Sequence, residues 1–593
     1  MSSSHAQVSS ASQSMSSNPA PDKHPTGAQG VARVIAEMEQ PTVFGMPGGY
    51  MVQLFDALHA FRDRVSVNLL REESLATVMA EARGRLTGSP SVVIGQGAWV
   101  LGNAGIGIME ALLGCSPMVI LIDSTDGGTF SHLGPYQAGG GGYGAYDLPA
   151  AMKAITKQTF VANHPSQAVQ MTRLAIKHAT SGEQGPVAVI FNAPALYTRM
   201  DPKKEPPVYA SAAYRESLRP IARQESVEQA AALIRAAKSP VIISGNGVRL
   251  AKAEQALMNF AGRHAIPVAT TPAGKGTFPE NHPLAVGLIG AFGHDTANLC
   301  VGRSDLLIAI GTKLGASDTA NQHPDLVDPG RQKIIQIDIE PLNLGWTLPV
   351  EVCVLGDVAE VLPRLGDAVS SASFGGLERV AAIRQSCPYF DRRALIARGD
   401  FSGKDAASIL SDVLPDDTVV TCDAGENRLF ILREFQTKQG GTVLQPNGGG
   451  GMGYAVPAAM AAAFTFPGRP AVAVCGDGGI SMTLHGLMSA VELGLNMTVV
   501  VFDNQVLGWV YSSQRDRIIA SAFSEFDFAA IATSIGCQAF RAEDDASLRA
   551  SLKHALAYPG VSLVVAKISR TDRYQDVMSS LHKYDIYSVP ENP

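Results

Sequence analysis

The stretch at residues 474–508, VCGDGGISMTLHGLMSAVELGLNMTVVVFDNQVLG, joins two apolar strands through a helix-length segment. The first strand ends in Gly476-Asp477-Gly478-Gly479, and the second, MTVVVF, runs into Asp503-Asn504. In an open parallel sheet the carboxyl ends of neighbouring strands face one crevice, where ligands bind. Asp477 and Asn504 are therefore predicted to meet as oxygen ligands, and the glycines let the backbone approach a phosphate closely. Because Mg2+ prefers such donors, the stretch predicts a magnesium-held diphosphate; an ordinary βαβ unit with an Asp-Gly turn is the alternative.

The rest of the chain repeats this alternation of strand and helix patterns. At 593 residues there is room for about three to four domains. We predict an α/β fold of three consecutive Rossmann-like, doubly wound parallel-sheet domains at residues 26–200, 215–370 and 387–570. A Ser-rich leader at 1–25 is predicted to be disordered, SSASFGGLE at 370–378 to be a linker, and the tail at 571–593 to lie over a surface or a cleft.

Composition excludes several classes of function. The net charge of −7, without a basic block, argues against nucleic acid and anionic membranes as partners. No apolar run approaches the roughly 20 residues that cross a bilayer. The seven cysteines are scattered and lie largely in apolar segments, which predicts reduced thiols at core positions of a cytoplasmic protein and not a disulfide framework or a zinc site.

The GDG…N spacing of residues 476–504 resembles that of thiamine diphosphate (ThDP) enzymes, and NQVLGWV is most similar to their acetolactate synthase branch. The resemblance covers nearly the whole chain after the leader, with the three domains as pyrimidine-binding, central and diphosphate-binding units. It implies that Asp477, Asn504 and the Val506 carbonyl ligate Mg2+, and that Gly478 and Gly479 donate N–H groups to phosphate. Further cofactor-binding residues implied by the resemblance are Gly425, Glu426, Asn427, Gly451, Leu507 and Gly508.

The catalytic glutamate of this family sits in a segment shaped like H-E-x-G-A-A…G-Y-A-R-x-T-G. Here the segment reads REESLATVMAEARGRLTG, and counting back from its RLTG places that glutamate at Glu73, with Glu72 where the family often has histidine. Glu73 would hydrogen-bond the ThDP pyrimidine so that the ring's amino group serves as internal base, and burial would favour its protonated form. A solvated Glu-Glu pair is the alternative. Met452 would wedge the cofactor into its bent shape, and Pro47 and Gly48 would line the same cleft.

Several departures from the family concern the substrate. Gln137 is kept as an active-site glutamine, but a glycine-rich insertion at 138–145 follows it, as either a mobile lid or a surface loop. Trp99 replaces a glycine-proline turn and would shape a pocket or simply pack. Ser513 stands where acetolactate synthases carry the tryptophan that selects the acceptor, which argues against acetohydroxyacid synthesis itself.

The central domain is similar to the FAD-binding domain of acetolactate synthases, so FAD is a possible further cofactor. GTKLGASDTA at 311–320 replaces the family's arginine-containing stretch, however, and a lysine does not substitute for an arginine at a bidentate site. Lys275, in a glycine-rich segment of the same domain, is predicted to be a solvated loop residue.

We therefore predict a ThDP- and Mg2+-dependent 2-oxo acid decarboxylase and carboligase that forms an acyloin-type C–C bond. The alternatives are a ThDP-dependent lyase or hydrolase of an acyloin or diketone, a flavin-linked 2-oxo acid oxidase, and a non-catalytic paralogue. The predicted partner is a small 2-oxo acid or related carbonyl compound. The resemblance also implies a homodimer or homotetramer, with active sites at the subunit interface.

Overall fold

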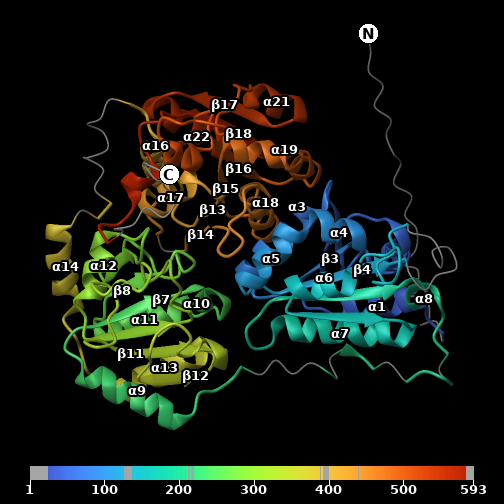
Figure 1. The fold of residues 1–593 in the computed structure, drawn as a ribbon, viewed down its shortest axis with the longest axis horizontal. Helices are drawn as coiled ribbons and strands as arrows, with labels where there is room; N and C mark the ends of the chain where they lie inside the picture. The colour runs from blue at the N-terminus through green and yellow to red at the C-terminus, as the bar shows by residue number, and fades with distance from the viewer. Residues whose placement is uncertain are drawn as a thin grey trace, which may run out of the picture.

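The computed structural model describes residues 24–125, 136–201, 203–206, 209–211, 214, 219–387, 389–390, 400–438 and 440–581. These residues form three separate six-stranded sheets, in which every strand pair is parallel, with helices packed around each sheet (Figure 1). The predicted fold class is confirmed. Nearly all of the predicted leader and the tail beyond residue 581 lie outside the described residues.

The N-terminal unit, blue to cyan in Figure 1, has the strand order β2-β1-β3-β4-β6-β5. Its first helix starts at a capping box, in which the Thr26 and Gln29 side chains satisfy each other's backbone N–H groups. Its third helix stops at Gly88, whose φ of 69° favours glycine. The elements are α1 (Gly27–Ala36), β1 (Thr42–Gly45), η1 (Gly49–Met51), α2 (Val52–Leu58), η2 (His59–Phe61), β2 (Ser66–Leu69), α3 (Glu73–Thr87), β3 (Ser91–Gln96), α4 (Gly97–Asn103), α5 (Gly105–Leu113), β4 (Met118–Ser124), α6 (Leu148–Ile155), β5 (Gln158–Ala162), α7 (Pro165–Thr180), β6 (Pro186–Asn192) and α8 (Ala193–Tyr197).

The central unit, green to yellow, has the order β12-β11-β10-β7-β8-β9, which is that of a dinucleotide-binding sheet with its switch point between β7 and β10. The elements are α9 (Gln224–Ala236), β7 (Pro240–Ser244), α10 (Asn246–Leu250), α11 (Glu254–His264), β8 (Val268–Thr270), β9 (Ala285–Leu288), α12 (Asp295–Gly302), β10 (Leu306–Ile310), β11 (Lys333–Asp338), η4 (Pro341–Asn343), β12 (Val352–Leu355), α13 (Val358–Val369) and α14 (Gly376–Ser386).

The C-terminal unit, orange to red, repeats the strand order of the N-terminal unit as β14-β13-β15-β16-β18-β17. Strands β15 and β16, which carry the metal-site stretch, are adjacent and central, as the sequence predicts. The elements are α16 (Gly403–Val413), β13 (Val419–Cys422), α17 (Glu426–Glu434), β14 (Thr442–Leu444), α18 (Ala455–Thr465), β15 (Ala471–Gly476), α19 (Asp477–Glu492), β16 (Met497–Asp503), α20 (Gly508–Gln514), α21 (Phe528–Ile535), β17 (Gln538–Ala542), α22 (Asp545–Ala557), β18 (Val561–Lys567) and η5 (Tyr574–Val577).

The N-terminal and C-terminal units share one hydrophobic core. Leu75 of α3 belongs to the same buried cluster as Met460 of α18 and Leu487 of α19. A methyl group built on Gly486 would lie 3.3 Å from the Leu75 side chain, so α3 packs closely against α19. This shared core fixes the α3 helix, which begins at Glu73, relative to the diphosphate-binding unit.

Two sequence-based expectations about the central unit are wrong. The predicted linker at 370–378 runs into helix α14, whose Val380 and Ile383 are buried in a core cluster of the central unit. Lys275 is fully buried and not solvated, because its ammonium lies 2.6 Å from the Glu280 carboxylate. That carboxylate also accepts the Thr437 N–H at 2.7 Å, so the ion pair joins the central and C-terminal units.

No helix among the described residues is long and apolar enough to cross a membrane. All seven cysteines are free thiols, and four of them are buried. Cys353 is exposed, however, which departs from the prediction of core positions.

Candidate active site

A cavity of about 110 Å3 lies at the carboxyl ends of β13, β15 and β16 in the C-terminal unit. This is the crevice where a doubly wound sheet binds its ligand. The cavity collects most residues that the sequence assigns to the diphosphate site. Those that line it are Gly425, Glu426, Asn427, Met452, Asp477, Gly478, Gly479, Asn504, Val506, Leu507 and Gly508.

Asp477 is the first residue of α19 and is 5% exposed. Its Oδ1 accepts the N–H of Gly478 at 2.8 Å, whereas its buried Oδ2 has no hydrogen-bond partner. Burial, with the neighbouring Asp503 carboxylate as a further cause, raises the pKa of Asp477 to about 6. An unsatisfied buried carboxylate oxygen is costly unless a cation or a donor completes it, so this atom fits a metal ligand.

The second predicted ligand, Asn504, is half-buried at the end of β16. Its Oδ1 accepts the Val506 N–H at 3.2 Å, and Gln505 between them has a φ of 59°. This tight turn is anchored where Leu507 N–H donates to the Ser521 carbonyl at 2.8 Å. Asn504 and Val506 therefore line the same cavity as Asp477.

Met452 lines the cavity together with Gly478 and Gly479 of α19. A methyl group built on Gly478 would lie only 2.9 Å from the terminal carbon of Met452, so glycine at 478 leaves room for that side chain. Gly478 and Gly479 lie in the first turn of α19, a helix that is kinked at Thr483, and the N–H groups at its N-terminus favour an anion. Gly451 does not line the cavity and packs instead against Ile106 of α5.

Glu426, at the start of α17, lines the cavity, and one of its carboxylate oxygens is bound by residues of α20 and η5. Oε1 accepts the Ser512 hydroxyl and the Tyr574 N–H, both at 2.9 Å. Tyr574 is fully buried and stacks on Trp509, with ring centroids 4.7 Å apart. Glu426 thus holds Tyr574, in the described part of the predicted tail, against Trp509 of α20.

Replacing Glu426 with Gln is expected to change how stability depends on pH. Burial raises the pKa of Glu426 from 4.5 to about 7, so between these pH values the folded protein binds more protons than the unfolded chain. The ionisation of Glu426 therefore lowers the free energy of unfolding by about 2–3 kcal/mol as the pH rises from about 4.5 to 7. Thermal unfolding at pH 5 and pH 8 should show Glu426→Gln more stable than wild type only at pH 8. The same difference at both pH values would contradict this assignment.

The predicted catalytic glutamate lies in the N-terminal unit, at the start of α3. Glu73 is 7% exposed, and its Oε2 accepts the side-chain amide of Asn103 at 3.1 Å. The neighbouring Glu72 is occupied differently: it caps α3 through the Ser74 N–H at 2.9 Å and lies 3.7 Å from His485 of α19. Of the two glutamates, Glu73 is the one whose carboxylate is buried away from helix capping and interdomain pairing.

The other residues predicted for this side gather at the ends of β1 and β3. Gln137 donates its side-chain amide to Gln96 Oε1 at 2.8 Å, and a methyl group built on Gly48 would clash with the amide of Gln96. Pro47 lies in the same turn as Gly48, between β1 and η1. Asp123 at the end of β4 fixes this arrangement, because it accepts the Tyr50 and Gly97 N–H groups at 2.8 and 3.0 Å.

The residues that depart from the family pattern near the predicted substrate site lie in different surroundings. The insertion forms a hairpin-like turn closed by a bridge between Gly140 and Asp147, with Tyr143 fully exposed. Trp99 on α4 is 51% exposed, so it does not serve as a core residue of its own unit. Ser513 does not line the 110 Å3 cavity; it donates to the Trp509 carbonyl at 2.8 Å and faces the Tyr574 hydroxyl at 3.3 Å. His132, which precedes the insertion and could carry a proton or be a polar loop residue, lies outside the described residues.

The predicted residues thus form two groups in one chain. The first group, in the C-terminal unit, lines the 110 Å3 cavity. The second group, Glu73, Pro47, Gly48 and Gln137 of the N-terminal unit, does not line it.

Comparison with protein families finds all three units. The description "Thiamine pyrophosphate enzyme, N-terminal TPP binding domain" matches residues 25–132, the "central domain" matches 227–365, and the "C-terminal TPP binding domain" matches 423–566. The chain belongs to the thiamine pyrophosphate enzyme family. It is an acetolactate synthase-like ThDP enzyme, and thiamine pyrophosphate is another name for ThDP.

The chain is also similar, over most of its length, to several acetolactate synthase large subunits. The chain is 31% identical to the acetolactate synthase large subunit of Corynebacterium glutamicum, over 87% of this chain and 82% of that protein. It is 28% identical to a probable acetolactate synthase large subunit of Methanococcus aeolicus, over 89% and 90% of the two chains. It is 26% identical to the isozyme 1 large subunit of Escherichia coli K12, over 92% and 95%.

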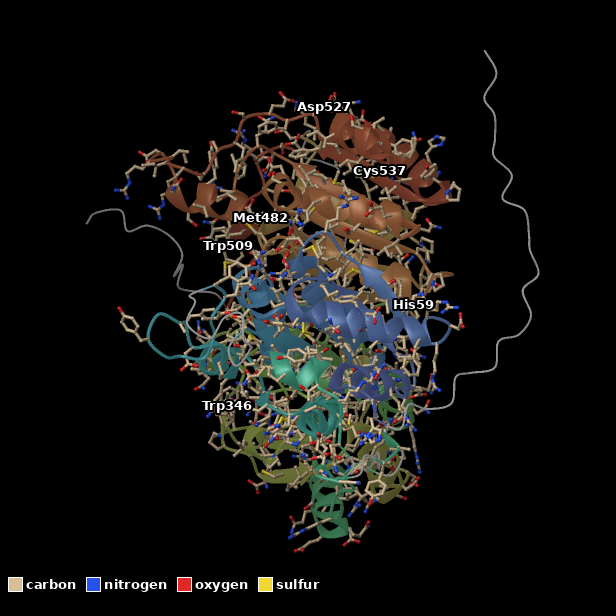
Figure 2. All side chains as sticks on the ribbon, turned by 90° about the vertical axis from the view of Figure 1, so that its right-hand side faces the viewer. His59, Trp346, Met482, Trp509, Asp527 and Cys537 are labelled. Atoms are coloured by element: carbon tan, nitrogen blue, oxygen red, sulfur yellow. The ribbon has the colours of Figure 1, made fainter. Side chains whose placement is uncertain are left out.

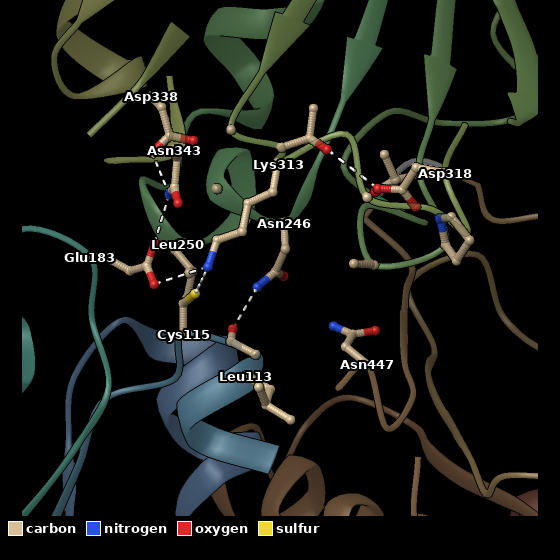
Figure 3. Close-up of a pocket in the computed structure, with 18 of the residues that line it drawn as sticks. Leu113, Cys115, Glu183, Asn246, Leu250, Lys313, Asp318, Asp338, Asn343 and Asn447 are labelled. Carbon is tan, nitrogen blue, oxygen red and sulfur yellow. Dashed lines mark hydrogen bonds and ion pairs between the residues drawn. The ribbon is translucent and has the colours of Figure 1, made fainter. Parts of the chain in front are cut away.

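A second cavity, of about 550 Å3, lies where all three units of this ThDP enzyme meet (Figure 3). It opens at the switch point of the central sheet, beside Asn246 after β7 and Lys313 after β10. Lys313 reaches the Glu183 carboxylate of the N-terminal unit at 3.0 Å, and Asn246 donates to the Gly114 carbonyl at 3.2 Å. Glu183, Asp318, Asp338 and Asp357 all line the cavity, which makes its wall rich in carboxylates.

Sequence reasoning missed several residues that hold the ThDP-site loops. Asp423, directly after β13, is 1% exposed and accepts the Gly453 N–H at 3.0 Å. Its position after a buried strand was a usable signal, the same one that picks out Asp477. Gln96 ends strand β3 and Asn103 ends helix α4, but their contacts with Gln137 and Glu73 depend on tertiary packing. No group of three or more His, Cys, Asp or Glu side chains suited to a metal occurs in the described part of the chain, and the predicted Mg2+ site has only one such residue.

Proposed function

We propose that this protein is a ThDP- and Mg2+-dependent 2-oxo acid decarboxylase and carboligase that forms an acyloin-type C–C bond. The observation that carries the proposal is the cavity at the ends of β15 and β16, which is lined by Asp477, with its unsatisfied buried Oδ2, and by Asn504 and Val506. One unpaired oxygen beside an amide and a backbone carbonyl matches the donor set that Mg2+ takes together with phosphate oxygens.

The chain's residues divide the work between binding and proton transfer. ThDP, when bound, supplies a nucleophilic carbon and an electron sink for 2-oxo acids. Asp477, Asn504 and the Val506 carbonyl would hold Mg2+, and the first turn of α19 would hold the diphosphate. Glu73 would hold a proton beside the pyrimidine, oriented by the Asn103 amide that it accepts at 3.1 Å. Gln137 would bind the polar end of the substrate, held in place by Gln96.

The test is a product analysis. Protein loaded with ThDP and Mg2+ is incubated with panels of 2-oxo acids and of aldehyde or ketone acceptors, and CO2 and products are followed by mass spectrometry. The proposal expects CO2 together with a coupled hydroxyketone. Cleavage of acyloins or diketones without CO2 would contradict it and favour the lyase alternative, and the loss of the acetolactate-synthase tryptophan at Ser513 makes that comparison informative.

We further propose that the reaction does not depend on FAD. The 550 Å3 cavity has the position of a dinucleotide site, but four carboxylates line it and Lys313 is already paired with Glu183. Arg428 is the other cation in the lining, and a wall with this excess of carboxylates gives poor compensation to a diphosphate. Flavin-free protein reconstituted with ThDP and Mg2+ is expected to be as active as protein that also receives FAD. A flavin requirement, or flavin bleaching on addition of substrate, would contradict this and favour the oxidase alternative.

We propose a homodimer or homotetramer in which the two residue groups meet between subunits. The support is a set of exposed apolar side chains around both groups, because large exposed apolar surface marks interfaces. On the N-terminal unit these include Trp99 and Leu113, and on the C-terminal unit Met482, which is 57% exposed and is labelled in Figure 2. Sedimentation of a monomer at working concentrations would contradict the shared site. The cytoplasmic location remains a prediction.

A further inference from the structure

The loop that presents Met452 is held by a carboxylate from a different unit. Glu110 of α5, in the N-terminal unit, is 1% exposed and lies against residues 447–449 of the C-terminal unit. Its Oε1 accepts the N–H groups of Asn447 and Gly448, the latter at 3.1 Å, and its Oε2 accepts the Gly449 N–H at 2.8 Å. Three consecutive backbone donors on one buried carboxylate make a strong, charge-assisted anchor.

A buried arginine supports this anchor from behind. Arg85 of α3 is 1% exposed and places Nη2 3.2 Å from Glu110 Oε1. Its Nη1 donates to the Gln445 carbonyl at 2.7 Å, two residues before the anchored N–H groups. Arg85 is also paired with Glu81, which accepts the Tyr454 hydroxyl at 2.8 Å. The cluster therefore contacts the loop on both sides of Met452.

The other end of the loop is fixed within the C-terminal unit. Asp423 accepts the N–H groups of Gly453, at 3.0 Å, and Ala455. The Gly451 carbonyl accepts the Ala424 N–H at 3.3 Å. Met452 thus lies between the Glu110 anchor before it and the Asp423 anchor after it, and its terminal carbon is held against Gly478.

The glycine content of the loop follows from its packing on α5. A methyl group built on Gly448 would lie 2.1 Å from Leu113 Cβ, and one built on Gly451 would lie 2.8 Å from the end of the Ile106 side chain. Ile106, Glu110 and Leu113 are spaced i, i+4 and i+7, so they share one face of the helix. The loop lies flat on this face, with its N–H groups turned to the carboxylate.

We propose that Glu110 is a positioning residue for ThDP. By binding residues 447–449, it fixes the position of the loop that presents Met452 to the thiazolium end of the cofactor. The inference rests on the proposed function, in which ThDP binds in the 110 Å3 cavity. It adds that the N-terminal unit, besides supplying Glu73, controls the shape of the diphosphate unit's cavity through a contact across the two units of one chain. The Mg2+ and diphosphate contacts of Asp477, Asn504 and Gly478 do not involve Glu110.

The test compares two probes on Glu110→Gln, an isosteric change that turns an acceptor for the loop N–H groups into an amide donor. Isothermal titration calorimetry measures the Kd of ThDP and of inorganic pyrophosphate, each with Mg2+. The Kd of ThDP is expected to rise about tenfold or more, as for other positioning contacts around a cofactor, whereas that of pyrophosphate stays unchanged. The near-UV circular dichroism of bound ThDP should also change. Wild-type affinity for ThDP in Glu110→Gln would overturn the proposal.

Two further variants separate positioning from general stability. Glu280→Gln removes another fully buried interdomain carboxylate, the partner of Lys275, and is expected to bind both probes as wild type does. Gly448→Ala lies at an exposed position but pushes the loop away from Leu113, so it should reproduce the selective loss of ThDP even if Glu110→Gln fails to fold. Equal loss of both probes in Gly448→Ala would overturn the positioning role. A wild-type protein that binds pyrophosphate but not ThDP would instead contradict the proposed function itself.

Discussion

Glu73→Gln is expected to lower the rate of CO2 release by about 10²–10⁴-fold, the usual contribution of a positioned proton-transfer group. The amide keeps the size of the side chain and can still accept the Asn103 amide, now 3.1 Å from Glu73 Oε2. It cannot hold or release a proton beside the pyrimidine. Steady-state rates of CO2 release at saturating ThDP and Mg2+ measure the effect, and the Kd of ThDP should change far less than the rate.

Glu72→Gln is the matched control, because it makes the same replacement of a carboxylate by an amide at the adjacent residue. Glu72 caps α3 through Ser74 and lies near His485, so its loss should lower the thermal midpoint by a few degrees. Activity should stay close to that of wild type. If Glu72→Gln lost as much activity as Glu73→Gln, or Glu73→Gln lost little, the assignment of the catalytic carboxylate to Glu73 would be wrong.

Asp477→Asn is expected to act in opposite directions on binding and on stability. Loss of the ligand with the free Oδ2 should weaken Mg2+-dependent ThDP binding by about 100-fold or more. In the metal-free protein, however, the pKa of Asp477 is raised from 3.8 to about 6, chiefly by burial. Its ionisation therefore costs stability as the pH rises from about 4 to 6, and the variant should be more stable at pH 7 by about 1–3 kcal/mol.

Calorimetric titration and thermal unfolding in the presence of EDTA measure the two effects of Asp477→Asn. Asp503→Asn is the control, since it removes the carboxylate whose charge couples to Asp477 but is not a predicted ligand. It should share the gain in metal-free stability and largely keep Mg2+ binding. Equal loss of Mg2+ binding in both variants would mean that negative charge, and not ligation by Asp477, holds the metal.

The residues that sequence reasoning placed correctly in one cavity are those at strand ends. Asp477 and Asn504 follow β15 and β16, and parallel pairing of these adjacent strands is enough to bring them together. The three-sheet fold is predictable for a similar reason, because each sheet is built from local strand-helix alternation. Lys275 was mistaken for a solvated residue because its glycine and proline neighbours indicate an exposed loop. Its burial depends on Thr437, which lies 157 residues from the Glu280 partner.

The contacts between units could not be predicted from the sequence. Glu110 lies 339 residues from the Gly449 N–H that it accepts, and nothing in the α5 sequence indicates that its carboxylate faces a glycine loop. Gly451 was assigned to cofactor binding, whereas the packing of Ile106 against it, and of Leu113 against Gly448, demands glycine at these positions. The helix α14 was missed because the residues just before it, SSASFG at 370–375, are Ser- and Gly-rich, although Val380 and Ile383 have helical spacing.

Release of the substrate's carboxyl carbon as CO2 should depend on both ThDP and Mg2+. Protein stripped of cofactors is given a 2-oxo acid labelled with 13C at its carboxyl group, and 13CO2 is followed by mass spectrometry while Mg2+ and ThDP are added in turn. Labelled CO2 is expected only when both Mg2+ and ThDP are present. It should be absent with Glu73→Gln and should be accompanied by a coupled product. Labelled CO2 without ThDP, undiminished release by Glu73→Gln, or no release from any 2-oxo acid alongside cleavage of acyloins would contradict the proposed function.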